Sequence, residues 1–221
     1  MSAIKLRCQL LERQSAKSSS PDLTARLLEG IADIGLTASQ MSHTVSLLLD
    51  MARLQIGQSL ELERETVDLV AMMKRLIQTY AELDSDHHFV LQGQDRSVSG
   101  SWDAARLESV IRNLLQNAIK YSPNGGDITI VIASAGEAGG ACVELSIRDG
   151  GMGIPAGDLP HIFERYYRAG NVSSRIQGAG IGLASVKAIV DQHQGSIAVA
   201  SQEGQGTTFT IRLPLQREAA A

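Results

Sequence analysis

The most regular pattern of apolar positions along the chain is a heptad seam between residues 27 and 52. Its members recur at alternating spacings of four and three residues, and they are Leu27, Ile31, Ile34, Ala38, Met41, Val45, Leu48 and Ala52. This spacing is typical of a helix that packs lengthwise against other helices. At a rise of about 1.5 Å per residue the seam is about 38 Å long. Upstream, Ile4, Cys8 and Leu11 lie on one face of a shorter predicted helix. Together, the seam and this helix predict a helical hairpin over residues 1–58.

A different pattern begins after a polar connector at residues 59–67. The next apolar positions predict an amphipathic helix at residues 69–83, with Leu69, Met73, Leu76, Tyr80 and Leu83 on one face and Asp68 as the expected N-cap. Short alternating segments predict strands at 88–91, 127–133, 141–148, 197–200 and 207–213, and helical patterns at 104–122 and 183–193 lie among them. We therefore expect a linker at 59–66, an α/β domain at 67–216 and a tail at 217–221.

Composition narrows the class of protein. The chain has 221 residues, of which 43% are hydrophobic and 20% charged, values typical of soluble globular proteins. Its formal net charge is −4, so no basic surface is expected for nucleic acid or an anionic membrane. Cys8 and Cys142 are the two cysteines, too few for a disulfide framework or a zinc cluster. No apolar run approaches bilayer length, and we expect a cytoplasmic chain without membrane contact.

The helix predicted at 104–122 carries an unusual set of polar residues. Its apolar face consists of Leu107, Ile111, Leu114 and Ala118. Asn113, Asn117 and Lys120 recur at helical spacing on another face. Asparagine is a poor helix former, so two of them one turn apart cost helix propensity without a packing gain. The pattern indicates either a ligand-binding face or a solvated polar face.

Two glycine-rich segments also lie next to predicted elements. In the first, residues 149–155, Asp149 stands at the end of a strand and is followed by closely spaced glycines. In the second, residues 178–183, glycines open a helix, where free backbone N–H groups favour an anion such as phosphate. An ordinary turn explains the first segment almost as well. The second is neither a dinucleotide fingerprint nor a P-loop.

Taken together and in order, these segments resemble the nucleotide-binding motifs of sensor histidine kinases in the GHKL ATPase superfamily. Residues 113–122 are similar to the N box of that family, 149–153 to its first glycine box and 178–183 to its second. Residues 163–168 resemble its F box, and residues 204–209 its final glycine motif. The resemblance implies an α+β chain: a two-layer α/β sandwich of the Bergerat type, with a mixed sheet and helices on one face, preceded by an α-helical hairpin.

The resemblance also implies ATP and Mg²⁺ as ligands and a role for particular residues. Asn117 would ligate Mg²⁺ through its amide oxygen, a hard donor. Asn113 and Lys120 would lie beside the phosphates. Tyr121 would lie against the adenine, and Asp149 would accept a hydrogen bond from its exocyclic amine.

Further positions follow from the same motifs. Arg165 or Arg168 would neutralise charge on the γ-phosphoryl group. The resemblance implies further nucleotide-binding positions at Gly151, Gly153, Gly178, Gly180, Gly182, Leu183 and Thr207.

The chain departs from the family pattern at two places. Gly150 replaces the asparagine commonly found inside the first glycine box. Residues 3–7 resemble sequence that follows the box bearing the phosphoacceptor histidine, so we expect this chain to lack that box. His43 points outward from the heptad seam and is followed by Thr44 where the family has an acid, which favours a solvated histidine.

The sequence thus predicts the catalytic core of a two-component sensor histidine kinase. Its activity would be transfer of the γ-phosphoryl group of Mg-ATP to a histidine and then to an aspartate of a response-regulator receiver domain. The hairpin would form a homodimer. Two alternatives remain: an ATP-binding dimerisation or regulatory module without kinase output, and an anti-sigma-type serine kinase, a class that lacks the long hairpin.

Overall fold

The structure is a computed structural model that describes residues 62–93, 97–137, 140–172 and 179–215, together with Gly30 and Ile34. The chain divides into two compact units, Met1–Ile56 and Gly57–Ala221. Gly30 and Ile34 are helical. The rest of the predicted hairpin, including His43, lies outside the described residues, as do Gly178 and the tail at 217–221.

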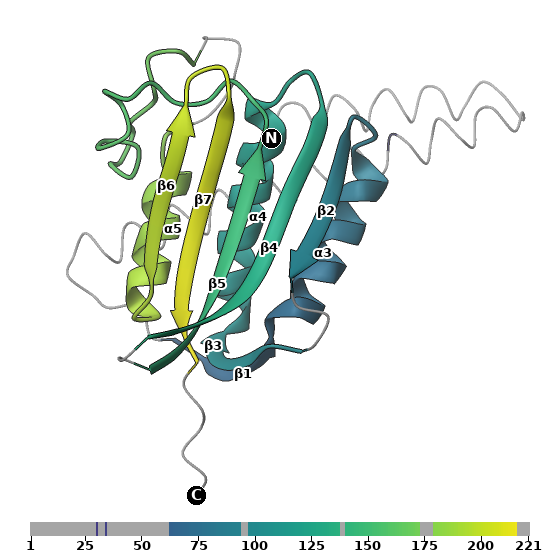
Figure 1. The fold of residues 1–221 in the computed structure, drawn as a ribbon, viewed down its shortest axis with the longest axis vertical. Coiled ribbons are helices and arrows are strands. Elements are labelled where there is room, and N and C mark those ends of the chain that lie inside the picture. Colours follow the sequence, from purple (N-terminus) through teal and green to yellow (C-terminus); the bar gives the residue numbers. More distant parts are fainter. Residues whose placement is uncertain are drawn as a thin grey trace, which may run out of the picture. The chain divides into compact units, whose positions relative to one another are not determined.

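Within the described part of the second unit, the main sheet has five strands in the order β2-β4-β5-β7-β6 (Figure 1). The strands are β2 (His87–Gly93), β4 (Gly126–Glu137), β5 (Gly140–Asp149), β6 (Ser196–Gln202) and β7 (Gly206–Pro214). β2 pairs with β4 in parallel, whereas the other neighbours are antiparallel. The sheet is therefore mixed, and all five predicted strand segments are confirmed.

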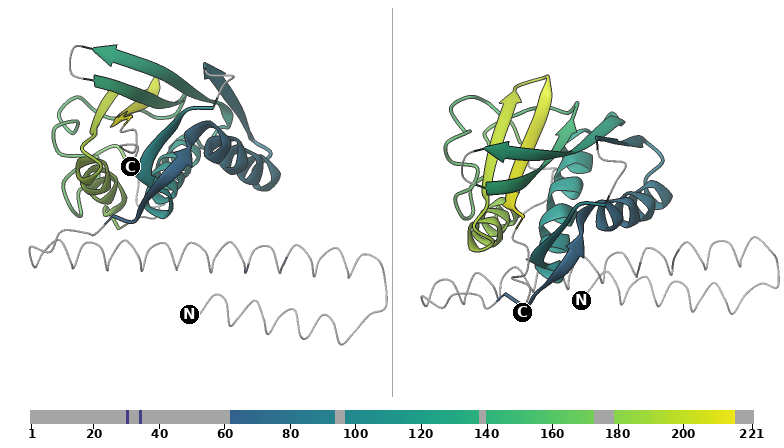
Figure 2. Two further views of the ribbon diagram at one scale, coloured as in Figure 1. Left: turned by 90° about the horizontal axis from the view of Figure 1, so that it is seen from below. Right: turned by 60° about the horizontal axis from the view of Figure 1, so that its bottom comes forward.

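The helices lie side by side on one face of this sheet, as both views of Figure 2 show. They are α3 (Leu69–Leu83), α4 (Ala104–Tyr121) and α5 (Gly182–Gln192), within one or two residues of their predicted bounds. Asp68 caps α3, as predicted, by accepting hydrogen bonds from the backbone N–H groups of Val70 and Ala71. The two-layer sandwich with a mixed sheet and helices on one face is confirmed.

The core fills the space between the two layers. Alternating side chains of β4 and β5 are buried with the apolar face of α4; the buried residues include Leu107, Ile111, Leu114, Ile128, Ile130, Ile132, Val143, Leu145 and Ile147. The predicted apolar face of α3 is buried except at Leu83, whose side chain is 51% exposed. Leu83 is the last residue of its helix, so the apolar face ends there.

A second, two-stranded sheet was not predicted by the pattern. β1 (Arg64–Asp68) and β3 (Ser99–Asp103) pair antiparallel at the lower end of the domain in Figure 1. The polar connector predicted at 59–67 thus contains a strand. Val67 is the one buried residue of β1, and β3 contains serine and glycine before the fully buried Trp102. Neither strand shows the apolar alternation on which the prediction depends.

A buried histidine joins two helices at this lower end. The Nε2 atom of His193 accepts a hydrogen bond from the backbone N–H of Asp103, at 3.0 Å, and Nδ1 donates to the carbonyl of Ile189, at 2.8 Å. Asp103 is the N-cap of α4, and His193 directly follows α5. These bonds require the neutral ring with its proton on Nδ1. His193 therefore fixes the start of α4 to the end of α5.

The free energy of unfolding should depend on the ionisation of His193. Burial lowers the pKa of His193, because desolvation disfavours the imidazolium. As the pH falls below about 6.5, the unfolded chain takes up a proton that the folded domain resists, so stability is lost. His193→Gln should lower stability at neutral pH but flatten its decline between about pH 6.5 and about pH 5. Urea denaturation across this range tests this, with the exposed His88→Gln as control. An unchanged pH slope in His193→Gln would disprove it.

Candidate functional site

The residues singled out in the sequence meet at the edge of the domain opposite His193. Three segments end or begin there: the C-terminal end of α4, the C-terminal end of β5 and the N-terminal end of α5 (Figure 1). The turn between β6 and β7 lies at the same edge. This edge gathers the side chains of one helix, the glycines of two loops and one buried carboxylate.

The two asparagines of α4 lie next to each other. The Asn117 Nδ2 atom donates to Asn113 Oδ1, at 3.2 Å, a hydrogen bond that does not use the amide oxygen of Asn117. Asn113 is buried and contacts the start of α5: a Cβ atom added at Gly182 would lie 2.5 Å from Asn113 Nδ2. The interpretation as a solvated polar face is therefore wrong for Asn113. Lys120 lies with its Nζ atom 4.8 Å from the centre of the Tyr121 ring.

Asp149 is the last residue of β5 and is 5% exposed. Burial raises the pKa of Asp149, because desolvation disfavours the carboxylate, although hydrogen bonds from the backbone N–H groups of Gly151 and Thr207 partly offset this. The N–H of Gly151 lies 2.9 Å from Asp149 Oδ1. Thr207 pairs with Asp149 across β5 and β7. A buried carboxylate at a strand end is suited to accept a hydrogen bond from a ligand amine.

The loop after Asp149 needs glycine at two positions. A Cβ atom added at Gly151 would lie 2.1 Å from the carbonyl oxygen of Tyr121. Gly153 has a φ of +66°, and a Cβ atom there would lie 2.0 Å from the carbonyl oxygen of Gln202. At Gly150, by contrast, no described atom would come within 4 Å of an added Cβ. The asparagine common in the family would therefore fit at Gly150.

Two side chains that hold this loop were missed in the sequence. Ser201 Oγ accepts from the N–H of Ile154, at 2.9 Å, and donates to the carbonyl of Gly206, at 2.8 Å. Asn171 Nδ2 donates to the carbonyl of Gly153, at 3.0 Å. Ser201 and Asn171 could not be found from motif spacing, because both contact the loop from other parts of the chain.

Residues 155–172 form a loop segment, which we call the lid segment. Asp158 accepts hydrogen bonds from the hydroxyl of Tyr167 and from the N–H of Gly170, both at 2.7 Å. These bonds join two parts of the lid segment to each other. Its Phe163 packs edge-on against Phe209 of β7, with ring centres 6.4 Å apart. The side chains of Arg165 and Arg168 are exposed.

The start of α5 is suited to an anion. In the described part of the chain no side chain caps this helix at Ile181, so the N–H groups of its first turn lack side-chain acceptors. Gly180 precedes it, with its carbonyl accepting from the N–H of Tyr166, at 2.8 Å. Leu183 in the first turn packs against the core. The described residues contain no group of three His, Cys, Asp or Glu residues that could hold a metal, so a cation here would depend on Asn117 and on ligand oxygens.

These residues fit a nucleotide with its cation. The edge offers a buried acceptor for a base, an uncapped helix N-terminus for phosphates and an amide oxygen for a hard cation. At residues 151, 153 and 182, glycine allows the loops to lie close to neighbouring atoms, where a Cβ atom would clash.

Comparison with known proteins agrees with this geometry. Residues 102–217 match the family described as histidine kinase-, DNA gyrase B-, and HSP90-like ATPase. The sensor histidine kinase TrcS of Mycobacterium tuberculosis is 36% identical over 200 residues, which cover 90% of this chain and 39% of TrcS. The sensor histidine kinase WalK of Bacillus subtilis is 32% identical over 188 residues, 83% of this chain and 30% of WalK.

A solved structure, the mycobacterial sensor histidine kinase MprB, is 29% identical and superposes with a TM-score of 0.56, covering 68% of this chain and 97% of that chain. The present chain spans well under two thirds of the length of TrcS and WalK. Among the described residues, no helix is long and apolar enough to cross a membrane.

Proposed function

Because the chain belongs to the sensor histidine kinases and carries their ATPase-type catalytic domain, we propose that residues 67–216 bind Mg-ATP and present its γ-phosphoryl group for transfer to a histidine. From that histidine the group would pass to an aspartate of a response-regulator receiver domain. The observation that supports this most strongly is the buried Asp149 beside the asparagines of α4 and the uncapped start of α5.

Adenine recognition is assigned to Asp149 and Tyr121. The carboxylate accepts a hydrogen bond from the exocyclic amine, and burial strengthens that bond because water does not compete for it. Tyr121, the last residue of α4, would offer a ring face to the base. Guanine presents a carbonyl where adenine presents the amine, so its oxygen would face the carboxylate and GTP would bind poorly.

Phosphate binding is assigned to the start of α5 and to α4. The backbone N–H groups after Gly180 and the ammonium of Lys120 attract the phosphates, with Asn113 beside them. Asn117 would hold Mg²⁺ together with phosphate oxygens. Bound Mg²⁺ would neutralise charge on the phosphates during transfer. Arg165 or Arg168 of the lid segment would stabilise the charge that develops on the γ-phosphoryl group.

Asn117→Ala should remove the dependence of nucleotide binding on Mg²⁺ while leaving much of the affinity for adenine. The amide oxygen is the proposed protein ligand of the cation, whereas Asp149 and Tyr121 are assigned to the adenine base. Calorimetric titration with ADP, with and without Mg²⁺, measures this. A variant that kept the full wild-type response to Mg²⁺ would remove Asn117 from the proposed cation site.

Phosphoryl transfer is tested by adding a separate acceptor. The chain is incubated with γ-labelled ATP and a helical hairpin that carries a phosphoacceptor histidine, and then with a receiver domain. We expect label on the hairpin that is labile in acid and stable in base, and its subsequent passage to the receiver domain. Intact ATP binding without any label would favour the alternative, an ATP-binding regulatory module without kinase output. Label on serine would favour the serine-kinase alternative.

We also propose that the chain forms a homodimer through the hairpin at residues 1–58, joined by the linker at 59–66. The support is the heptad seam, because an exposed apolar stripe about 38 Å long is more than a monomer usually tolerates. Sedimentation should show a dimer that depends on concentration, and Met41→Glu or Val45→Glu should dissociate it without loss of ATP binding. A strict monomer at high concentration would contradict dimerisation.

A further inference from the structure

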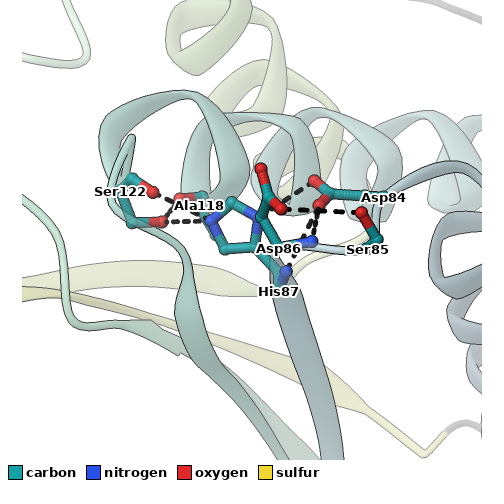
Figure 3. Close-up of polar contacts among 6 residues, drawn as sticks. All are labelled: Asp84, Ser85, Asp86, His87, Ala118 and Ser122. Atoms are coloured by element: carbon teal, nitrogen blue, oxygen red, sulfur yellow. Dashed lines mark hydrogen bonds and ion pairs between the residues drawn. The ribbon is translucent and has the colours of Figure 1, made fainter.

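A buried histidine outside the predicted motifs lies at the same edge as the nucleotide site. His87 is the first residue of β2 and is 7% exposed. Figure 3 shows its ring between Asp84, which follows α3, and Ser122, which follows α4. Nδ1 lies 2.9 Å from Asp84 Oδ2, and Nε2 lies 2.9 Å from the carbonyl oxygen and 3.0 Å from the hydroxyl of Ser122.

The partners of His87 determine the direction of these hydrogen bonds. The hydroxyl of Ser122 donates its one hydrogen to the carbonyl of Ala118, so toward Nε2 it accepts. The carbonyl oxygen of Ser122 also accepts, and Nε2 must therefore carry a proton. Burial would raise the pKa of Asp84, but hydrogen bonds from the His87 ring and from backbone N–H groups outweigh burial and hold that pKa below its ordinary value. Asp84 is thus a carboxylate, and the form of His87 that satisfies both sides is the imidazolium, which donates from both nitrogens.

The end of α4 that His87 holds is in contact with the loop of Asp149. Ser122 is the C-cap of α4 and directly follows Tyr121. The carbonyl of Tyr121 accepts from the N–H of Met152, at 2.9 Å, and Gly151 packs closely against the same carbonyl. A continuous series of contacts therefore runs from His87 through Ser122 and Tyr121 to the residues that follow Asp149.

We propose that His87 is a positioning residue for adenine recognition: by donating to Asp84 and to Ser122 it fixes the end of α4, and with it Tyr121 and the loop that follows Asp149. This inference rests on the proposed binding of ATP at Asp149. A second effect acts in the same direction. Burial raises the pKa of Asp149, and hydrogen bonds from backbone N–H groups, followed by a smaller Coulombic contribution from His87, oppose that rise and so favour the carboxylate that accepts from adenine.

The neighbouring histidine provides a matched control. His88 follows His87 on the same strand and is exposed. His87→Gln retains a donor toward one side only, and should weaken ATP and ADP equally, by about 2- to 30-fold, with an unchanged number of binding sites per chain. His88→Gln should bind both nucleotides as the wild type does. A merely structural role would instead lower the number of competent sites and leave the dissociation constant unchanged, and that result would overturn the proposal.

A second pair of variants keeps the test independent of how well His87→Gln folds. Asp84→Asn weakens the partner of Nδ1 at a partly exposed position, and Asp86→Asn, two residues away, is its control. We expect weaker ATP binding in the first and none of this effect in the second. Wild-type affinity in Asp84→Asn would overturn the proposal.

A double-mutant cycle distinguishes this inference from the assignment of Asp149 itself. Because His87 is proposed to act through the loop of Asp149, the losses of affinity in His87→Gln and Asp149→Asn should be less than additive. Additive losses would overturn the inference and leave Asp149 in place. A wild-type chain that failed to bind ATP would overturn both the inference and the proposed function.

Discussion

Asp149→Asn should weaken ATP binding by about 10- to 100-fold and leave the folded domain intact. A hydrogen bond to a charged acceptor contributes about 1.5 to 3 kcal/mol, which corresponds to this loss of affinity. The amide oxygen of the asparagine can still accept from the N–H of Gly151, and its NH₂ group then faces the adenine amine, where it repels rather than binds. Calorimetric titration with ATP measures the change in dissociation constant.

The stability of the same variant provides its control. Because burial raises the pKa of Asp149, the folded domain binds this proton more tightly than the unfolded chain. As the pH rises from about 4 through the folded-state pKa of Asp149, ionisation of this carboxyl therefore lowers the free energy of unfolding. The charge of Asp149 does not itself stabilise the fold. A neutral asparagine removes this cost, so at about pH 7 the variant should be at least as stable as the wild type. A variant that unfolds more readily at neutral pH would contradict this account of the site.

Gly153→Ala should destabilise the domain by about 2 to 4 kcal/mol and abolish nucleotide binding. A residue with a Cβ atom is strained at a φ of +66°, and that atom would lie 2.0 Å from the carbonyl oxygen of Gln202. This carbonyl belongs to the backbone of β6, which cannot move without disturbing the sheet. The loop would have to shift, and the geometry after Asp149 would be lost.

Gly150→Ala, in the same loop, is the matched control. No described atom lies within 4 Å of a Cβ atom built there, so we expect a change in stability within about 0.5 kcal/mol and nearly full ATP binding. Urea denaturation and calorimetry of the two variants side by side test the prediction. Equal losses at both positions would show that close packing of the loop is not what requires glycine at Gly153.

Much of the fold could be predicted because most of its elements carry their own periodicity. The alternation of Ile128, Ile130 and Ile132 marks one strand, and the spacing of Leu107, Ile111 and Leu114 marks one helix. β1 and β3 were not predicted, because Val67 is the one buried residue of β1 and such a short two-stranded sheet shows no alternation of apolar residues. Leu83 fits the helical pattern but lies at the end of α3, where packing stops.

In the candidate site, too, some residues could be predicted from the sequence and others could not. The motif residues were recognisable because adenine, phosphate and cation chemistry each need particular residue types at fixed spacing, as Asn113 and Asn117 illustrate. The residues that support them were not recognisable. His87 contacts Ser122 across 35 positions of sequence, and Ser201 contacts Ile154 across 47. Such contacts depend on how the sheet and helices meet, which no local pattern encodes.

The most direct test of the account is the comparison of ATP with GTP in the same calorimeter, in the presence of Mg²⁺. If the buried carboxylate of Asp149 accepts from the adenine amine, the wild-type chain binds ATP with one site per chain and binds GTP at least about tenfold more weakly. The Asp149→Asn variant should lose most of this discrimination. Equal affinities of the wild-type chain for ATP and GTP would contradict the central claim.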